Sequence, residues 1–316
     1  MALSLRRGRV TRVVERHADL VRCEVDGVAC IAHPELTGPV DEGDEVLVNV
    51  QARELELGSG GFDVLYANLT QGLELQRSEG AHVMALPYAP GQWAVRHAEE
   101  EGGLADRLDG LPVVLCTVHS QVVPVCAALD GVRVAFLQVA GGALALGLSD
   151  AVRALRERGL VASTASVAPC FGGDVRCVSV ASAQLWATTE HDVAVCGVGP
   201  GIVGTGTRFG HGAISLAEAA NVASALGGTP VLVQRVSSGD ERERHRGVSH
   251  HTQAVLDLIL GDVLIAPDEL GDGWREACEG LPLSHMGRGA DEEGAHFAAA
   301  FAAGRLAAER ARKGDR

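Results

Sequence analysis

The sequence predicts an α/β fold in which a doubly wound, mostly parallel sheet follows a small N-terminal β-barrel of the SH3 or OB kind. From Leu111 onward, continuous apolar runs alternate with segments of helical pattern, as in strands that helices cover on both faces. Before about residue 70, short strand-like runs are separated by turn residues, as in a small barrel. We therefore expect a barrel domain at 1–70, a connector at 71–110 and an α/β domain with a C-terminal helix at 111–316.

The strands expected in the barrel are GRVTRVVE, DLVRCEV, GVACIAH, DEVLVNV and FDVLYANL. Turn signals such as Asp26-Gly27, Gly38-Pro39 and Gly43-Asp44 separate them. The connector follows as a stretch punctuated by Pro and Gly, ALPYAPGQWAVRHAEEEGG, in which we expect one short helix.

In the α/β domain, the expected strands include LPVVLCTV, VRVAFLQVA, VASTASVA, DVAVCGVG and TPVLVQRV, each followed by a helical segment. Repeated strand-helix-strand units join parallel strands through right-handed crossovers. The final segment, DEEGAHFAAAFAAGRLAAERARK, begins with acidic residues and ends with basic ones. This distribution matches the macrodipole of a terminal helix.

The charge of the chain excludes several functions. Lys+Arg 27 against Asp+Glu 41 gives a net charge of −14, which disfavours binding to nucleic acid or to an anionic membrane surface. Aromatic residues make up 3% of the chain, so the stacking platforms that bind single-stranded nucleic acid are scarce. Lys313 is the single lysine of the sequence, which rules out a Walker A loop and a lysine Schiff base.

No apolar run is long enough for the core of a signal peptide or for a membrane helix, so we expect a cytoplasmic protein without membrane association. The 8 cysteines form no CxxC pair, and most lie in apolar runs, where they are expected to be buried hydrophobic residues. Cys170 differs, because it stands between Pro169 and the pair Gly172-Gly173, which is followed by Asp174. It is the cysteine whose reactivity we would test.

Ligands of open parallel sheets bind beyond the carboxyl ends of the strands. The residues that follow the expected strands are polar, small or titratable: His119-Ser120, Gly141-Gly142, CFGGD at 170–174, GVGPGIVGTGTRFGHG at 197–212 and QRVSSGDERERHRGVSHH at 234–251. We expect these segments to lie at one edge of the sheet and to form the site.

The glycine-rich run at 197–212 is a candidate anion cradle. Consecutive backbone N–H groups in such a loop can converge on an anion, and the N-terminus of the following helix adds positive potential. The expected ligand-binding residues of the run are Gly199, Gly201, Gly204, Thr205, Gly206, Thr207 and Arg208. The alternative is a tight turn that needs glycine only for packing.

Residues 199–204 match the dinucleotide pattern GxGxxG formally. Three features count against that interpretation: the helix is expected to begin only near Ala213, Pro200 lacks a backbone donor, and the next strand ends in Gln234-Arg235 where an acidic residue is usual. Nicotinamide binding is therefore a minor alternative.

The loop from Ser237 to Thr252 forms a basic island in an acidic chain, which suits attraction of a small anion. Arg246 is its expected anion-binding residue, and Asp240, His250 and His251 are candidate catalytic residues. Surface arginines paired with Glu241 and Glu243 are the alternative explanation for part of this charge.

His119 and Ser120 are further candidate catalytic residues, because they follow a strand and precede a helix. A serine there can simply cap the helix, and no GxSxG motif surrounds it. A metal site built from the histidines at 119, 211, 245, 250 and 251, with Asp174 and Asp240, is an alternative. The histidines show neither HxH nor HExxH spacing, and adjacent histidines such as His250-His251 rarely bind one ion together, so the sequence leaves a metal site open but does not indicate one.

The segments VVLCTVHSQVVPV, CFGGDVRCVSV, GVGPGIVGTGTRFG and RERHRGVSHHT resemble a bacterial family catalogued only as a domain of unknown function, the 3866 series. The resemblance spans nearly the whole chain. It implies a cytoplasmic bacterial protein with the same motifs, and it brings no activity, ligand or catalytic residue.

Two hypotheses follow. The first is an enzyme, a hydrolase or group transferase, that acts on a small anionic metabolite held by the glycine-rich loop. The second is a sensing or interaction protein that binds the anion without turnover. The substrate, any cofactor, the role of the barrel and the oligomeric state stay open, and a homo-oligomer is compatible with the sequence.

Overall fold

The computed structural model describes residues 3–56, 61–75 and 78–313. The chain forms two compact units, Met1–Arg96 and His97–Arg316. Their boundary falls within the segment 71–110 that the sequence predicts as a connector.

Unit 1 contains a closed barrel of five strands, which confirms the predicted small β-barrel. The strands are β1 (Leu5–Arg16), β2 (Val21–Val25), β3 (Val28–Ala32), β4 (Glu45–Asn49) and β5 (Asp63–Asn68), in the order β1-β2-β3-β5-β4. β3 and β5 run parallel, and the other neighbours are antiparallel. Of the two expected kinds, this order is that of the OB barrel.

The remaining elements of unit 1 are short. They are α1 (Pro34–Thr37), α2 (Gln51–Glu54) and an antiparallel pair, β6 (Val83–Ala85) with β7 (Trp93–Val95). The barrel interior holds Val10, Val21, Cys23, Val25, Cys30 and their neighbours. Alternate residues of each strand point inward, so this core follows from the period of two in the barrel sequence.

Unit 2 contains a sheet of six parallel strands, which confirms the predicted α/β class. They are β8 (Pro112–Cys116), β9 (Val134–Val139), β10 (Ser163–Val167), β11 (Val175–Cys177), β12 (Val193–Val198) and β13 (Thr229–Val233). The order is β11-β10-β9-β12-β8-β13, so β12 lies between β8 and β9. Sequence patterns predicted β8, β9, β10, β12 and β13 and their parallel direction, but predicted neither β11 nor this order.

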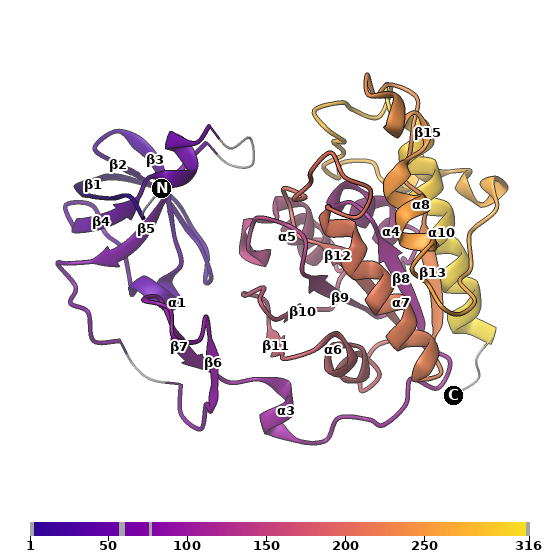
Figure 1. Cartoon of the computed structure of the whole chain (residues 1–316), viewed down its shortest axis with the longest axis horizontal. Helices are drawn as coiled ribbons and strands as arrows, with labels where there is room; N and C mark the ends of the chain where they lie inside the picture. Colours follow the sequence, from indigo (N-terminus) through magenta and orange to yellow (C-terminus); the bar gives the residue numbers. More distant parts are fainter. Residues whose placement is uncertain (1–2, 57–60, 76–77, 314–316) are drawn as a thin grey trace. The chain divides into compact units, whose positions relative to one another are not determined.

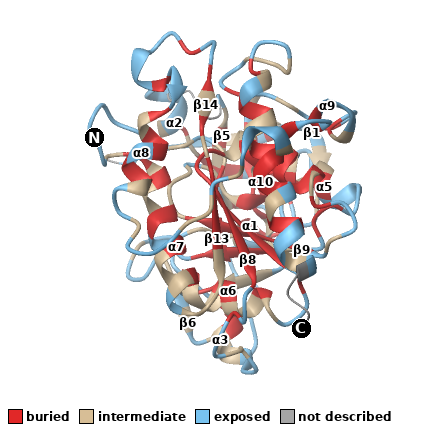
Figure 2. Cartoon of the chain, turned by 90° about the vertical axis from the view of Figure 1, so that its right-hand side faces the viewer, coloured by how far each residue is buried: buried red, intermediate tan, exposed pale blue. Residues whose placement is uncertain are grey.

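Helices cover both faces of the sheet (Figure 1). One face packs against α4 (Val122–Ala127), α5 (Asp150–Glu157), α9 (Trp274–Ala277) and α10 (Gly294–Lys313). The other packs against α3 (Ala98–Glu101), α6 (Val180–Ala187), α7 (Ser215–Ala225) and α8 (His250–Leu256). Val114 and Leu115 of β8 point to opposite faces and are both buried. Figure 2 shows β8 and β13 as buried strands beneath helices whose outer residues are exposed.

Short elements connect these layers in unit 2. They are the 3-10 turns η1 (His119–Gln121), η2 (Leu146–Leu148), η3 (Gly212–Ile214), η4 (Glu243–His245) and η5 (Asp268–Gly271), and the paired strands β14 (Val236–Ser237) and β15 (Gly247–Val248). Of these turns, η1 follows β8 and carries His119 and Ser120, and η4 carries His245.

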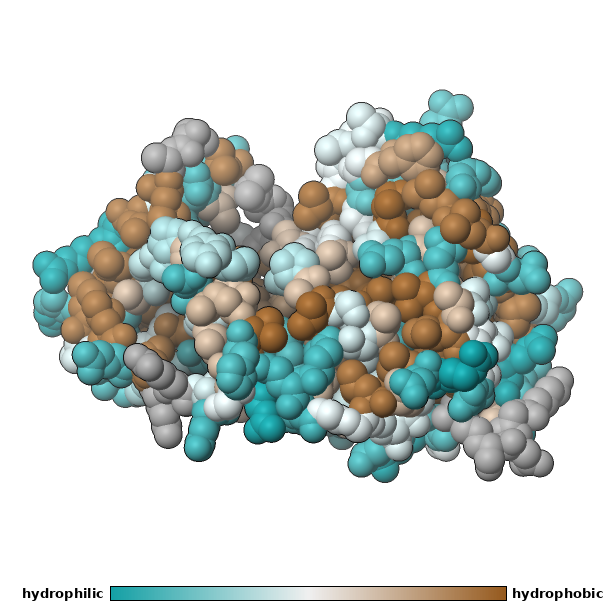
Figure 3. Space-filling model, turned by 60° about the horizontal axis from the view of Figure 1, so that its bottom comes forward, coloured by the Kyte–Doolittle hydropathy of each residue, from teal (hydrophilic) through white to brown (hydrophobic). Residues whose placement is uncertain are grey.

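Within residues 3–56, 61–75 and 78–313, no helix has both the length and the apolar character needed to cross a membrane. On the face shown in Figure 3, hydrophobic side chains occur in separate groups between hydrophilic ones.

Gly304 provides a test of the packing between α10 and α4. A Cβ at this position would lie 2.4 Å from the backbone oxygen of Val125 and 2.7 Å from Cβ of Ala128. In an open helix, Gly to Ala stabilises by roughly 0.5–1 kcal/mol, whereas overpacking costs roughly 1–3 kcal/mol. We expect Gly304→Ala to lower the free energy of unfolding, measured by urea denaturation. Gly294→Ala, whose Cβ would meet nothing closer than 3.6 Å, is the control and should be neutral or stabilising.

Candidate functional site

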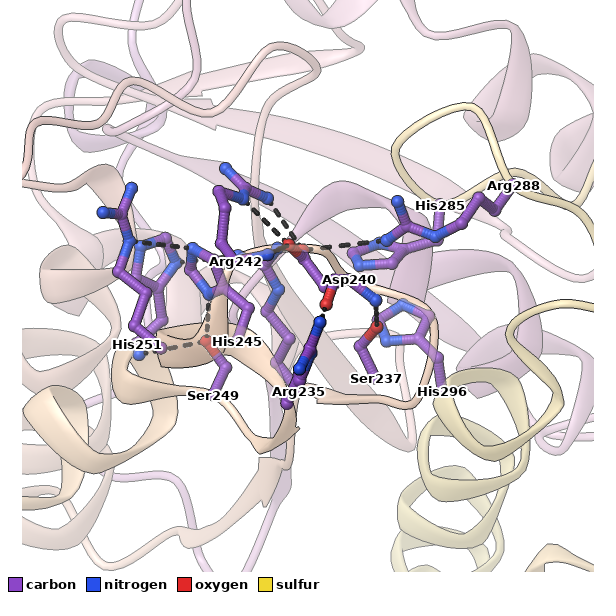
Figure 4. A network of polar contacts seen from close by, with 12 residues as sticks. Arg235, Ser237, Asp240, Arg242, His245, Ser249, His251, His285, Arg288 and His296 are labelled. Carbon is purple, nitrogen blue, oxygen red and sulfur yellow. Dashed lines mark hydrogen bonds and ion pairs between the residues drawn. The ribbon is translucent and has the colours of Figure 1, made fainter.

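Because the six strands of unit 2 are parallel, the segments that follow them lie at one edge of the sheet, as expected from the sequence. β8 leads into His119 and Ser120, β12 into the glycine-rich loop, and β13 into Arg235. These three strands are neighbours in the sheet, in the order β12-β8-β13. The edge above them carries a continuous polar network, which Figure 4 shows.

Arg235 lies at the centre of this network and is the largest fully buried side chain, with 1% exposure. Its backbone N–H donates to Oγ1 of Thr252 (2.9 Å), and its Nη1 donates to Nδ1 of His251 (3.1 Å). Nη2 lies 3.6 Å from a carboxylate oxygen of Asp240. Among the described residues, Nε and Nη2 have no hydrogen-bond partner. Burial lowers the pKa of Arg235 to about 10, so the guanidinium still carries its charge at neutral pH.

Asp240 faces three arginines. It accepts hydrogen bonds from Nε and Nη2 of Arg242 at 2.9 and 2.8 Å, and it forms longer ion pairs with Arg235 and Arg288. Its hydrogen bonds to Arg242 hold the pKa of this carboxyl well below its usual range.

Glu293 is the second carboxylate of the network. Its Oε1 accepts from Oγ of Ser237 (2.7 Å) and from Nε of Arg288 (2.6 Å). Three guanidinium groups therefore face two carboxylates, and positive charge is in excess. A network with this balance favours the approach of an anion.

Ser120 contacts two histidines that come from distant parts of the chain. Its Oγ lies 2.9 Å from Nδ1 of His285 and 3.0 Å from Nε2 of His296. Nδ1 of His296 lies 3.2 Å from the backbone oxygen of Val236. Since a carbonyl oxygen only accepts, Nδ1 of His296 carries the proton, and its Nε2 accepts the hydroxyl proton of Ser120. His285 then donates from Nδ1 to Oγ of Ser120.

Both histidines are buried and neutral at pH 7. Burial lowers the pKa of His285 to about 3, and it lowers the pKa of His296 well below the usual value. Nε2 of His285 has no hydrogen-bond partner among the described residues. The arrangement thus contains a half-buried hydroxyl between a proton acceptor and a proton donor.

A second group of histidines lies on the other side of Arg235. His211, from the end of the glycine-rich loop, stacks on His251 with ring centroids 3.8 Å apart. The ring of His250 lies 5.6 Å from that of His211 and 4.5 Å from that of His251. The ring centroid of His245 lies 4.8 Å from that of His250 and 5.0 Å from that of His251. The predicted candidates His250 and His251 therefore meet the glycine-rich loop through His211.

His119 does not join either group through a hydrogen bond. Its Nδ1 donates to the backbone oxygen of Val198 (3.0 Å), and its Nε2 contacts Oγ of Ser149 (2.7 Å). Ser149 also accepts from the backbone N–H of Val152 and caps α5. Both ring nitrogens are thus used in joining β12 to α5, and burial lowers the pKa of His119 to about 4. This geometry favours a structural role for His119.

The glycine-rich loop contains two kinds of glycine. A Cβ on Gly199 would lie 2.6 Å from Nε2 of Gln138, and one on Gly212 would lie 2.0 Å from the backbone oxygen of Gly141. These glycines allow close backbone packing. Gly204 and Gly206 lie at the exposed tip of the loop. Gly201, which is also predicted to bind a ligand, has a positive φ of 69°. α7 begins at Ser215, well after the GxGxxG match, and this late start counts against a dinucleotide site.

The polar residues of the same loop are paired with neighbours. Thr205 and Thr207 share a hydrogen bond of 2.9 Å between their hydroxyls, and Arg208 forms an ion pair with Asp257. Arg246 is exposed, and its Nε donates to the backbone oxygen of Asp240 (3.0 Å). The loop and Arg246 remain candidates for ligand binding.

The predicted residues after β10 lie elsewhere on the edge, because β9 and β12 separate β10 from β8. Asp174 accepts from the backbone N–H and the hydroxyl of Thr164 and from Arg156, so it ties β10 to β11 and α5. Gly172 and Gly173 both have positive φ, at 95° and 82°. Cys170 is half-buried, and burial raises the pKa of its thiol, which disfavours the reactive thiolate.

Comparison with known proteins identifies a family and no activity. The family model described as Protein of unknown function (DUF3866) matches residues 29–278. The chain belongs to this family. The matched range contains Ser120, Arg235 and the histidines of the second group, whereas His285 and His296 lie after it. No curated protein and no solved structure matches the chain.

The buried histidines predict loss of stability in acid. An unfolded histidine has a pKa near 6.5, whereas burial lowers the pKa of folded His119 to about 4. Between these values the unfolded chain binds more protons, so the free energy of unfolding falls as pH falls. His119 alone should cost about 2 kcal/mol between about pH 7.5 and about pH 5. Urea denaturation of His119→Gln at several pH values should show a shallower dependence of the free energy of unfolding on pH than the wild type shows.

The two kinds of loop glycine predict different effects of the same substitution. Gly212→Ala should lower the free energy of unfolding by about 2 kcal/mol or more, because the added Cβ meets backbone atoms of Gly141. Gly206→Ala should change it by less than about 0.5 kcal/mol, because a Cβ there meets nothing within 4 Å. Thermal denaturation of both variants measures the difference. Equal destabilisation by the two substitutions would contradict the packing role assigned to Gly212.

Proposed function

We propose that the protein is a hydrolase or group transferase that acts on a small anionic metabolite, with Ser120 as the nucleophile. The observation that carries this proposal is the position of Oγ of Ser120, within 3.0 Å of ring nitrogens of two buried histidines. Serine follows a strand and precedes a helix here, as nucleophilic serines often do.

The contacts support a specific division of roles. Oγ of Ser120 attacks the acyl carbon or phosphorus of the substrate, and its proton passes to Nε2 of His296. The backbone oxygen of Val236 holds the other ring proton of His296 and so keeps Nε2 directed at the serine. The leaving group then takes the proton from His296, and the acylated or phosphorylated serine remains. Water or an acceptor alcohol, deprotonated by His296, releases the group and restores Ser120.

The excess of guanidinium groups supports the anionic substrate. Arg242 and Arg288 have side chains that are 42% and 21% exposed, so a ligand can reach them. The buried guanidinium of Arg235 adds positive charge beneath this surface. An anion beside these groups would also offset the positive charges that lower the pKa of His285 and His296, and it would strengthen both as bases. In this proposal Asp240 orients the arginines. The glycine-rich loop and Arg246 bind a more distant part of the metabolite.

The second hypothesis, anion binding without turnover, has its own support. Burial, together with the charges of Arg235 and its neighbours, lowers the pKa of the two histidines and keeps them neutral and weakly basic in the free protein. A binding protein would use the same arginines and leave the hydroxyl of Ser120 unreactive. The reactivity of Ser120 therefore separates the two hypotheses.

A fluorophosphonate probe tests that reactivity in the full chain. We expect modification of Ser120, located by mass spectrometry, at least about 100-fold faster than that of Ser182, a half-buried serine on α6 that bonds to Ser179. His296→Gln should slow the reaction about 100-fold, and Ser120→Ala should abolish it. Labelling of Ser120 no faster than of Ser182, together with a rise in melting temperature in phosphate or pyrophosphate, would favour the binding protein over the enzyme.

A further inference from the structure

The histidines on the other side of Arg235 offer nitrogen atoms that the proposed reaction does not use. One nitrogen each of His211, His250 and His251 lies within 4.8 Å of those of the other two. His211 and His251 are buried, and His250 is half-buried. They come from two segments, the end of the glycine-rich loop and the start of α8.

Two of these side chains have unused ring nitrogens. Both nitrogens of His211, which is 6% exposed, lack a hydrogen bond of normal geometry among the described residues, apart from a looser contact with the backbone oxygen of Arg208. Nε2 of His250 is buried and also lacks a partner. A buried imidazole nitrogen without a hydrogen-bond partner destabilises the folded chain unless a ligand binds to it.

We propose that His211, His250 and His251 bind one divalent transition-metal ion, of the class of Zn²⁺ or Co²⁺. Three neutral imidazoles form a typical ligand set for these ions, whereas Mg²⁺ and Ca²⁺ prefer oxygen. Burial lowers the pKa of all three side chains, so the imidazoles are neutral at neutral pH and no proton has to leave before an ion binds. The fourth position of the ion stays open for water or an anion.

Binding requires two local changes. The rings of His211 and His251 are stacked at 15°, so one ring has to turn before both lone pairs reach the same ion. His211 turns without losing a regular hydrogen bond. In the structure, Nδ1 of His251 accepts a hydrogen bond from Arg235, so Nε2 carries the proton. His251 can coordinate through Nε2 once this proton has moved to Nδ1 and the hydrogen bond from Arg235 has broken. Arg235 then shifts towards Asp240, whose carboxylate is already 3.6 Å from Nη2.

The charge of Arg235 also specifies the fourth ligand. A guanidinium near a divalent cation opposes binding of the bare ion and favours an ion that carries an anion in its open position. We therefore expect phosphate to tighten metal binding, in contrast to its usual competition with proteins for free metal.

The experiment measures metal binding directly and does not depend on activity. The wild-type full chain, freed of metal with a chelator, is titrated with Zn²⁺ and with Co²⁺ by calorimetry, with and without phosphate. We expect one ion per chain and no binding of Mg²⁺. Bound Zn²⁺ should also protect His250, the half-buried histidine of the three, from diethyl pyrocarbonate, as read by mass spectrometry. The absence of binding, or binding that leaves His250 unprotected, would overturn the proposal without any variant.

Variants locate the ion. His211→Ala and His250→Ala should each weaken binding by about 100-fold or more, since each removes a ligand. His245→Gln is the matched control: it lies in the same cluster, but its ring nitrogens contact Oγ of Ser249 (2.7 Å) and Nε of Arg244 (3.4 Å). It should keep the wild-type affinity, and a loss equal to that of His250→Ala would contradict the assignment. Ser120→Ala should bind the ion normally, so this test and the labelling test can fail independently.

Discussion

The guanidinium of Arg235 is the charge on which the rest of this edge of the sheet depends. A charged group at 1% exposure is stable only when carboxylates and hydrogen-bond acceptors surround it. Asp240 and His251 come from the loop and helix after β13, and both contact this side chain. Asp240 also pairs with Arg288, which Glu293 holds just before α10. One buried charge thus links β13, α8 and the segment before α10, and it leaves positive charge unbalanced beside Ser120.

The histidines show a related constraint. Burial and, to a smaller extent, the charge of Arg235 lower the pKa of histidines on both sides of this side chain, for example His285 and His251. Neutral imidazoles can accept a serine proton or coordinate a metal ion, and protonated ones can do neither. The positive environment that attracts an anion therefore also preserves the form of histidine that both proposed sites need.

The sequence predicted the classes of both folds, because the apolar periods of strands and helices depend on local burial. It also placed Ser120 and Asp240 on the correct edge, because the ends of parallel strands share an edge. The sequence pattern places Arg235 at the end of a strand but does not predict its burial, since a single sequence does not show that a charged side chain is buried.

Two other parts of the site were missed for reasons of topology. His285 and His296 follow no strand of the sheet, so a search of strand ends does not reach them. His211 lies far in sequence from His250 and His251, and metal motifs defined by short spacing do not detect such a group. His119 satisfied the positional rule, yet its contacts with Val198 and Ser149 show why position alone does not specify a role.

The order of the sheet has a consequence for synthesis of the chain. β8 and β9 leave the ribosome one after the other, but β12 separates them in the sheet, and α10 covers β8 and β13. β9 has both of its neighbours only after residue 198 has emerged, and β8 only after residue 233. The face of β8 that packs against α10 is not fully covered until α10 is made. Long-range pairing of this kind slows folding and prolongs the exposure of apolar strands. The last strand of the barrel in unit 1 ends at Asn68, so the barrel can close while unit 2 is still being translated. During this time the uncovered strands of unit 2 are most prone to aggregation.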